Sequence, residues 1–297
     1  PRLALIALFA AVPLLYFVYL PVSYSFDGTV FSHMLRFALL KHDPAGVLQV
    51  HHLLYFPANY LLYRLLGFLF HYRVLEFFHL QLFSMLCGVG TLLLVERMLK
   101  KLDLGAAARL AGVSLVAFSL AFWQFSVDAE IHVPGLLFIT AGMYLLLFPV
   151  KKPWSLPGAA LCFAVGAGFH LTNGLIAVTA FFILLARRAP WRRFAEFYLS
   201  YSFFILVLFC GYALATGRPV LSVLYDIFFA PNAYSGYRSS AFHPVALSTV
   251  AASFAALKNA LVTDAGLWAW LICGATLALF VLGARPAPER DASGFKL

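Results

Sequence analysis

The apolar residues of this chain gather in long stretches, and short polar segments separate them. A helix that crosses a bilayer needs about 20 mostly apolar residues. The pattern therefore predicts an all-α polytopic membrane protein with about eight transmembrane helices. The predicted helices cover residues 3–20, 74–95, 106–122, 133–150, 156–169, 171–186, 194–215 and 267–283.

A ninth apolar stretch, residues 53–70, carries Pro57, Asn59 and Arg64 in its interior. An arginine at the centre of a spanning helix costs about 2.5–3.5 kcal/mol on insertion scales. We therefore expect residues 53–70 not to span. Together with residues 29–40, they should form helices that lie along the membrane interface.

The apolar run 156–186 is too long for one ordinary span. Gly166, Gly168, His170, Asn173 and Gly174 interrupt it near its centre. Glycines and polar residues of this kind punctuate a helix. The run should therefore form two short helices that meet at the outer face.

The basic residues support one orientation of these helices, because cytoplasmic loops are enriched in Lys and Arg. With eight spans and the N-terminus inside, fourteen of the 21 basic residues are cytoplasmic. They are Arg2, Arg97, Lys100, Lys101, Arg109, Lys151, Lys152, Arg187, Arg188, Arg192, Arg193, Arg285, Arg290 and Lys296. Nine spans with the N-terminus outside would also keep the later clusters inside, so charge alone leaves that topology open.

We therefore expect one transmembrane domain over residues 1–284, with both termini cytoplasmic. Its first outer loop should cover residues 21–73 and its second 217–264, and residues 285–297 should form a polar cytoplasmic tail. No small-residue cleavage site follows the first apolar run, so residues 3–20 are interpreted as an anchor and not as a signal peptide.

Composition agrees with a membrane protein, since 63% of the residues are hydrophobic, 11% are charged and the mean hydropathy is +0.89. The net charge of +9 comes from short clusters and not from a continuous stripe, which favours membrane orientation over nucleic-acid binding. The four cysteines lie in apolar runs without CxxC spacing, so neither disulfides nor a zinc site are indicated.

Under this topology the outer face collects most of the ionisable residues other than Lys and Arg. These are Asp27, His33, His42, Asp43, His51, His52, Asp128, Glu130, His132, His170, Asp226 and His243. Ionisable residues at membrane depth are costly and often functional, so the asymmetry predicts a site at the outer boundary.

Several of these residues have a structural interpretation beside the functional one. Asp27 follows the first span and could accept a proton from an attacking hydroxyl, or it could cap a short helix. Asp128, Glu130 and His132 crowd the start of the helix predicted from residue 133, with Asp128 and His132 one turn apart. Carboxylates there could bind substrate or complement the helix dipole. Residues His51 and His52 could contact phosphate or be ordinary interfacial histidines.

Two further segments are candidates for substrate binding. His170 and Asn173 lie in the break of the long apolar run, where polar groups can face a cavity, although His170 could also be a satisfied structural histidine. The second outer loop holds Tyr237, Arg238 and His243, and Arg238 could clamp a phosphate. Alternatively, this loop is an aromatic belt with an arginine whose charged head reaches to the membrane surface.

Three short motifs resemble the GT-C superfamily of membrane glycosyltransferases, in the branch similar to protein O-mannosyltransferases. Ser25-Phe26-Asp27-Gly28 is similar to the acidic motif of the first outer loop in that branch. The stretch from Phe122-Trp123 to Ala129-Glu130-Ile131-His132 and the segment Gly168-Phe169-His170-Leu171-Thr172-Asn173 are similar to two others. Where the family often has His-Pro-Pro, this chain has His51-His52-Leu53 and reaches Pro57 only later.

The resemblance implies an inverting glycosyltransferase that moves a sugar, mannose as the first expectation, from a polyprenyl-phosphate donor to an acceptor hydroxyl. It implies that Asp27 is the catalytic base and that no cofactor or divalent metal is needed. The acceptor could be a protein, a lipid or a glycan. A multi-pass bacterial inner-membrane location, with the active site facing outward, follows.

In this hypothesis the donor phosphate is held by Arg238 and His243, with help from His51 or Arg36. Glu130, His132 and His170 orient the sugar or the acceptor. The alternative is a transporter or flippase that uses the same carboxylates and histidines as a proton relay, although the chain shows no convincing pair of repeated halves.

Overall fold

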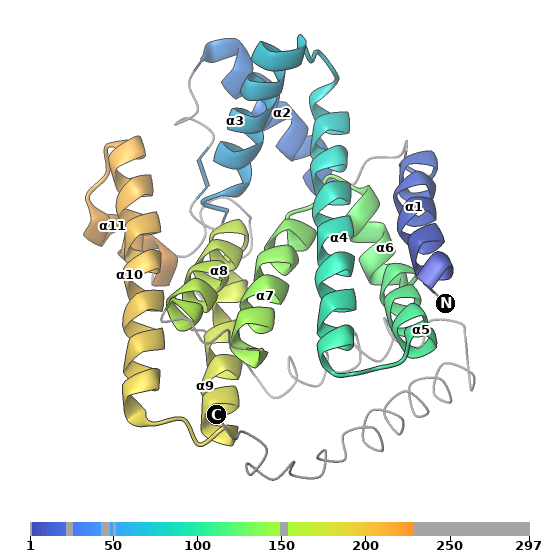
Figure 1. Ribbon diagram of the computed structural model, residues 1–297. Coiled ribbons are helices and arrows are strands. Elements are labelled where there is room, and N and C mark those ends of the chain that lie inside the picture. The colour runs from blue at the N-terminus through green and yellow to red at the C-terminus, as the bar shows by residue number, and fades with distance from the viewer. Residues whose placement is uncertain (1, 22–25, 43–47, 50–51, 149–153, 229–297) are drawn as a thin grey trace, which may run out of the picture. The chain divides into compact units, whose positions relative to one another are not determined.

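The computed structural model describes residues 2–21, 26–42, 48–49, 52–148 and 154–228, which lie in one compact unit, Pro1–Ala241 (Figure 1). Every regular element in this part of the chain is a helix, as the apolar pattern predicts. The helices are α1 (Arg2–Val18), α2 (Phe26–Lys41), α3 (Tyr55–Phe70), α4 (Glu76–Lys101), α5 (Ala106–Ala117), α6 (Leu120–Val127), α7 (His132–Leu147), α8 (Ser155–Phe169), the 3₁₀ helix η2 (Leu171–Leu175), α9 (Ile176–Ala186), α10 (Trp191–Thr216) and α11 (Val220–Phe228).

Two helices of the described part, α4 and α10, are long and apolar enough to cross a membrane, and each has 26 residues. The consecutive helices α5 and α6 pass the same test together, as a bent pair. Shorter apolar helices are Leu3–Val18, His132–Leu147, Ser155–Phe169 and Leu171–Ala186, whereas α2 and α3 belong to neither class. The chain is thus a multi-pass membrane protein. The predicted span 267–283 and the tail lie outside the described residues.

The predicted span 106–122 is not one straight helix. It breaks between α5 and α6, whose axes differ in direction by 62°. The backbone of Ser119 is extended at the break, with φ −66° and ψ 136°, and its hydroxyl donates to the Val116 carbonyl. A side chain that bonds the preceding turn competes with helix continuation, and apolar periodicity does not reveal this.

The predicted break in the run 156–186 is confirmed. Helix α8 ends at Phe169, and the backbone of His170 is extended, with φ −149° and ψ 121°. The short helix η2 then leads into α9. The side chain of Asn173 donates to the Gly166 carbonyl at 3.0 Å, so a polar group satisfies one of the carbonyls that the end of α8 exposes.

Close packing of α7 on α8 forms the centre of the bundle. A Cβ atom added at Gly142 would come within 2.5 Å of the Phe163 ring, and one added at Gly166 would lie 3.2 Å from the Gly135 carbonyl oxygen. Small residues at such positions let two membrane helices approach closely. Phe163 and Phe197 are fully buried, so the same cluster also joins α8 to α10.

Hydrogen bonds and ion pairs between helices show which helix ends lie together. Arg187, at the end of α9, donates to the carbonyls of Leu146 and Leu147 at the end of α7. Arg109, near the start of α5, pairs with Glu96 in the last turns of α4. We call this group the basic end. At the opposite end of α4, helices α2 and α3 lie side by side against it (Figure 1).

Candidate active site

The segment that precedes α3 docks on the break after α8. The Leu54 amide donates to the Gly168 carbonyl at 2.9 Å. The Nδ1 atom of His52 lies 3.3 Å from the Phe169 carbonyl oxygen. A carbonyl can only accept, so this contact fixes the proton on Nδ1 of His52. Residues of the predicted first outer loop therefore contact the break after α8. A single site built from both segments requires this contact.

Three histidines from three distant segments lie in one row. The rings of His52 and His170 are 5.2 Å apart between centroids, and those of His170 and His132 are stacked at 5.2 Å. The Phe31 ring of α2 lies at one end of the row, with its centroid 5.9 Å from that of His52. The Phe125 ring of α6 lies at the other end, with its centroid 5.1 Å from that of His132. The sequence named all three histidines as candidates, and the fold brings them together.

The ring of His170 is oriented by the short helix that follows it. Its Nδ1 atom accepts from the Thr172 amide at 3.3 Å and lies 2.6 Å from the Thr172 hydroxyl. Because the amide can only donate, Nδ1 is the unprotonated nitrogen, and Nε2 carries the proton. His170 therefore presents an N–H donor on the side of the ring away from Thr172.

Asp128 and Glu130 lie in the link between α6 and α7, and both are buried. The prediction that Asp128 and His132 lie one helical turn apart is wrong, because α7 begins only at His132. The Asp128 carboxylate accepts from the Ala129 amide at 2.7 Å, which favours a turn over a helix. The Ser84 hydroxyl of α4 donates to the Glu130 carbonyl at 3.0 Å and lies 3.3 Å from its amide. This pair of contacts fixes the link against α4.

Tyr55, at the start of α3, is a site residue that the sequence did not indicate. Its ring is fully buried in a cluster with Ala129 and Ile131, the neighbours of Glu130. Its hydroxyl has no hydrogen-bond partner among the described residues. Burial raises the pKa of Tyr55 well above its ordinary value, and the nearby carboxylates of Glu130 and Asp128 raise it further. The hydroxyl is therefore a neutral donor beside two acids.

The remaining candidates are less completely placed. Asp27 is the second residue of α2, one helical turn before Phe31, and its side chain lies outside the described residues. Arg36 is exposed further along α2. The candidates His51, Tyr237, Arg238 and His243 also lie outside the described part of the chain.

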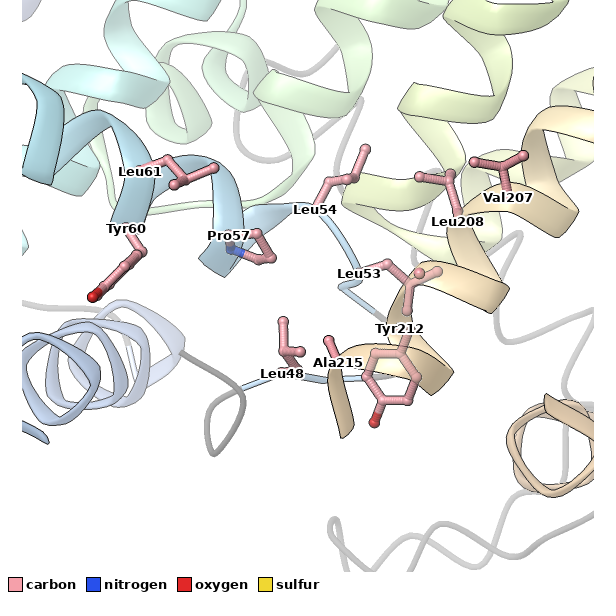
Figure 2. A pocket seen from close by; sticks show the side chains of 11 residues that line it. Leu48, Leu53, Leu54, Pro57, Tyr60, Leu61, Val207, Leu208, Tyr212 and Ala215 are labelled. Carbon is pink, nitrogen blue, oxygen red and sulfur yellow. The ribbon is translucent and has the colours of Figure 1, made fainter. Parts of the chain in front are cut away.

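An apolar pocket of about 450 Å³ opens beside this site (Figure 2). Leu53, Leu54 and Pro57 form one wall at the start of α3, and Leu208 and Tyr212 belong to the opposite wall on α10. His52 directly precedes Leu53 in the chain, so the pocket begins next to the histidine row. A further wall residue, Gly211, leaves open space where a Cβ atom would lie.

The described residues do not include a group of three or more His, Cys, Asp or Glu side chains arranged to hold a metal ion. The three histidines lie in a row in which the rings of His170 and His132 are stacked and the ring of His52 is tilted by 57° to that of His170. A row of this kind suits contacts to oxygen atoms along an extended polar ligand.

The family model described as dolichyl-phosphate-mannose-protein mannosyltransferase matches residues 74–213. The match runs from α4 into α10 and includes Glu130, His132 and His170, but not the first loop with Asp27. No curated protein and no solved structure matches the chain.

Proposed function

Because the chain belongs to the dolichyl-phosphate-mannose-protein mannosyltransferase family, a GT-C family of membrane glycosyltransferases, we propose that it transfers mannose with inversion to an acceptor hydroxyl. Members of this family use a dolichyl- or polyprenyl-phosphate-mannose donor, and so does this enzyme. In our proposal the reaction takes place at the extracytoplasmic face of a bacterial inner membrane, in a bundle of about eight spans.

The observation that carries the proposal is the row of His52, His170 and His132 beside an apolar pocket. A lipid-phosphate sugar has a polar head and an apolar tail, and these two features lie next to each other here. The prenyl chain would enter the pocket between α3 and α10. The phosphate and the sugar would then lie along the histidines, where the Nε2–H group of His170 donates to an oxygen of the donor.

Asp27 is the proposed general base. Position 27 is one turn before Phe31, and Phe31 contacts the His52 ring, so the start of α2 belongs to the same end of the molecule. The Asp27 carboxylate takes the proton of the acceptor hydroxyl as that oxygen attacks the anomeric carbon. The new glycosidic bond forms while the bond from carbon to phosphate oxygen breaks, and the lipid phosphate leaves with the electron pair. Attack opposite to the leaving group inverts the anomeric carbon.

The buried acid Glu130 has a positioning role in this proposal. Glu130 is held by its main chain on Ser84, and Tyr55 lies beside it with a neutral hydroxyl. Carboxylates bind sugar hydroxyls by charge-assisted hydrogen bonds. Glu130 with His132 and Asn173 would orient the mannose or the acceptor, and Arg36, His51, Tyr237, Arg238 and His243 would supply further contacts to phosphate.

The test is transfer by purified protein supplied with a panel of radiolabelled polyprenyl-phosphate sugars and candidate acceptors. We expect labelled acceptor and free lipid phosphate with the mannose donor, and neither with Asp27→Asn at equal expression and thermal stability. Full activity of Asp27→Asn would reject the base assignment. Uptake of the donor by vesicles without release of lipid phosphate would instead favour a carrier.

A further inference from the structure

A second cavity, of about 490 Å³, lies at the basic end of the bundle and has no role in the proposed reaction. Its walls are Arg97, Lys100 and Lys101 in the last turns of α4, Asp103 just after that helix, and Tyr144 of α7. Three cations and one carboxylate therefore surround one hollow. The surplus of positive charge favours an anionic ligand.

The cations of this cavity differ from the nearby arginines in their ion pairs and hydrogen bonds. Arg109 has an ion pair with Glu96, and Arg193 has one with Glu196. Arg187 donates to main-chain carbonyls of α7. In contrast, Arg97, Lys100 and Lys101 have no ion pair with any described carboxylate.

The position of the cavity along α4 indicates which anion can reach it. A helix of 26 residues is ~39 Å long at 1.5 Å per residue, whereas the hydrocarbon core of a bilayer is about 30 Å thick. Part of α4 therefore extends past the hydrocarbon core, and the three cations in its last turns indicate that this end reaches the headgroup layer. Leu102 and Leu104 are exposed directly beside the cations, which is the amphipathic surface that a lipid molecule contacts.

We propose that this cavity binds the phosphate group of an anionic phospholipid from the adjacent leaflet. Lys100 and Lys101 carry three N–H donors each, and Arg97 adds a planar guanidinium suited to phosphate oxygens. The Tyr144 hydroxyl supplies a neutral donor at the wall of α7. The acyl chains of the lipid would lie against the exposed leucines. This proposal does not depend on the glycosyltransferase activity.

The experiment measures the thermal unfolding midpoint of the full chain in phosphatidylcholine nanodiscs that contain increasing fractions of phosphatidylglycerol. The wild type should become more stable along a saturating curve. The double variant Lys100→Gln and Lys101→Gln should need a higher fraction of phosphatidylglycerol for the same stabilisation. Its affinity for this lipid should be about fivefold lower per lost charge. The double variant Arg192→Gln and Arg193→Gln, which loses the same charge at the start of α10, should match the wild type.

Three outcomes would overturn the proposal. They are an unchanged curve for the lysine variant, equal weakening in both double variants, and the same stabilisation by inorganic phosphate without anionic lipid. If the lysine variant does not fold, Arg97→Gln gives the same comparison with a single charge removed. Native mass spectrometry of the wild type provides a second readout, because a bound phosphatidylglycerol molecule should be retained and then lost at high ionic strength.

Discussion

The two ends of the described bundle are both polar, yet they use their polar groups differently. At the basic end, long cationic side chains hold neighbouring helices, as Arg187 does on α7 and Arg109 does on Glu96. At the end with the histidine row, the polar side chains come from links and breaks between helices. Three imidazole rings lie in contact there, two of them stacked, and the hydroxyl of Tyr55 remains without a described partner.

The difference indicates that charge alone does not identify the candidate site. Exposed arginines and lysines that bind the ends of helices serve orientation and stability. Buried acids such as Asp128 and Glu130, on the irregular link between α6 and α7, require that the fold compensate their desolvation, which membrane proteins tolerate mainly at functional positions. Substitution of the same type of residue at the two ends should therefore have different effects on transfer and on stability.

The largest contrast is expected between two glutamates, one at each end. Glu130→Gln should lower kcat/KM for transfer about 10- to 100-fold, because a charge-assisted hydrogen bond to substrate contributes roughly 1.5–3 kcal/mol. Glu96→Gln should leave transfer per folded molecule nearly unchanged. Steady-state kinetics with the mannose donor measure both. Equal losses in the two variants would show that the ends are not functionally distinct.

The free energy of unfolding should instead depend on side chains at the basic end. Arg187→Gln removes the guanidinium that donates to the carbonyls of Leu146 and Leu147. It should lower the free energy of unfolding by about 1 kcal/mol, since the group is partly exposed and water replaces part of the interaction. Urea titration of the purified protein measures this change, with Arg188→Gln as the neighbouring control. A loss of transfer without a loss of stability would contradict the structural role.

The apolar pocket provides a prediction that is specific to the donor's tail. Gly211→Phe should fill the open space on α10 and raise KM about tenfold for a long polyprenyl donor, the loss of roughly 1.4 kcal/mol of binding. A donor with a short soluble tail should be affected much less, and Gly211→Ala should be close to wild type with both donors. If KM rises equally for long and short tails, the pocket does not hold the prenyl chain.

The smallest effect on transfer is expected from the residue that orients His170. Thr172→Val removes the hydroxyl that lies 2.6 Å from Nδ1 but keeps the amide donor. Transfer should fall only a few-fold, because one neutral hydrogen bond contributes about 1 kcal/mol. Thr172→Ser should restore the wild-type rate. The absence of this rescue would mean that the methyl group of Thr172, and not its hydroxyl, matters.

Much of this arrangement could be predicted from the sequence, because the membrane limits the backbone to a few solutions. The apolar runs give the helices, and the glycines and polar residues around His170 give the break after α8. The family model matches residues 74–213, in agreement with the resemblance drawn from Glu130, His132 and His170. These signals are local in the chain, which is why sequence patterns contain them.

Features that depend on contacts between distant segments could not be predicted in the same way. The row of histidines joins residues from three separate segments, and ring stacking has no sequence signature. The bend between α5 and α6 depends on the side chain of one serine, Ser119, in an apolar run. In sequence, Tyr55 resembles any other aromatic residue of an interfacial helix, and only the fold shows its ring packed with Ala129 and Ile131, the neighbours of Glu130.

The pocket in Figure 2 has walls of different origin, since α10 lies within the family-matched segment up to residue 213 whereas α3 precedes residue 74. In the proposed reaction, the space for the prenyl tail is therefore formed jointly by the family-matched segment and by a helix that precedes it. A chimera that replaces only residues 53–70 could change the preferred chain length of the donor while the membrane bundle stays intact.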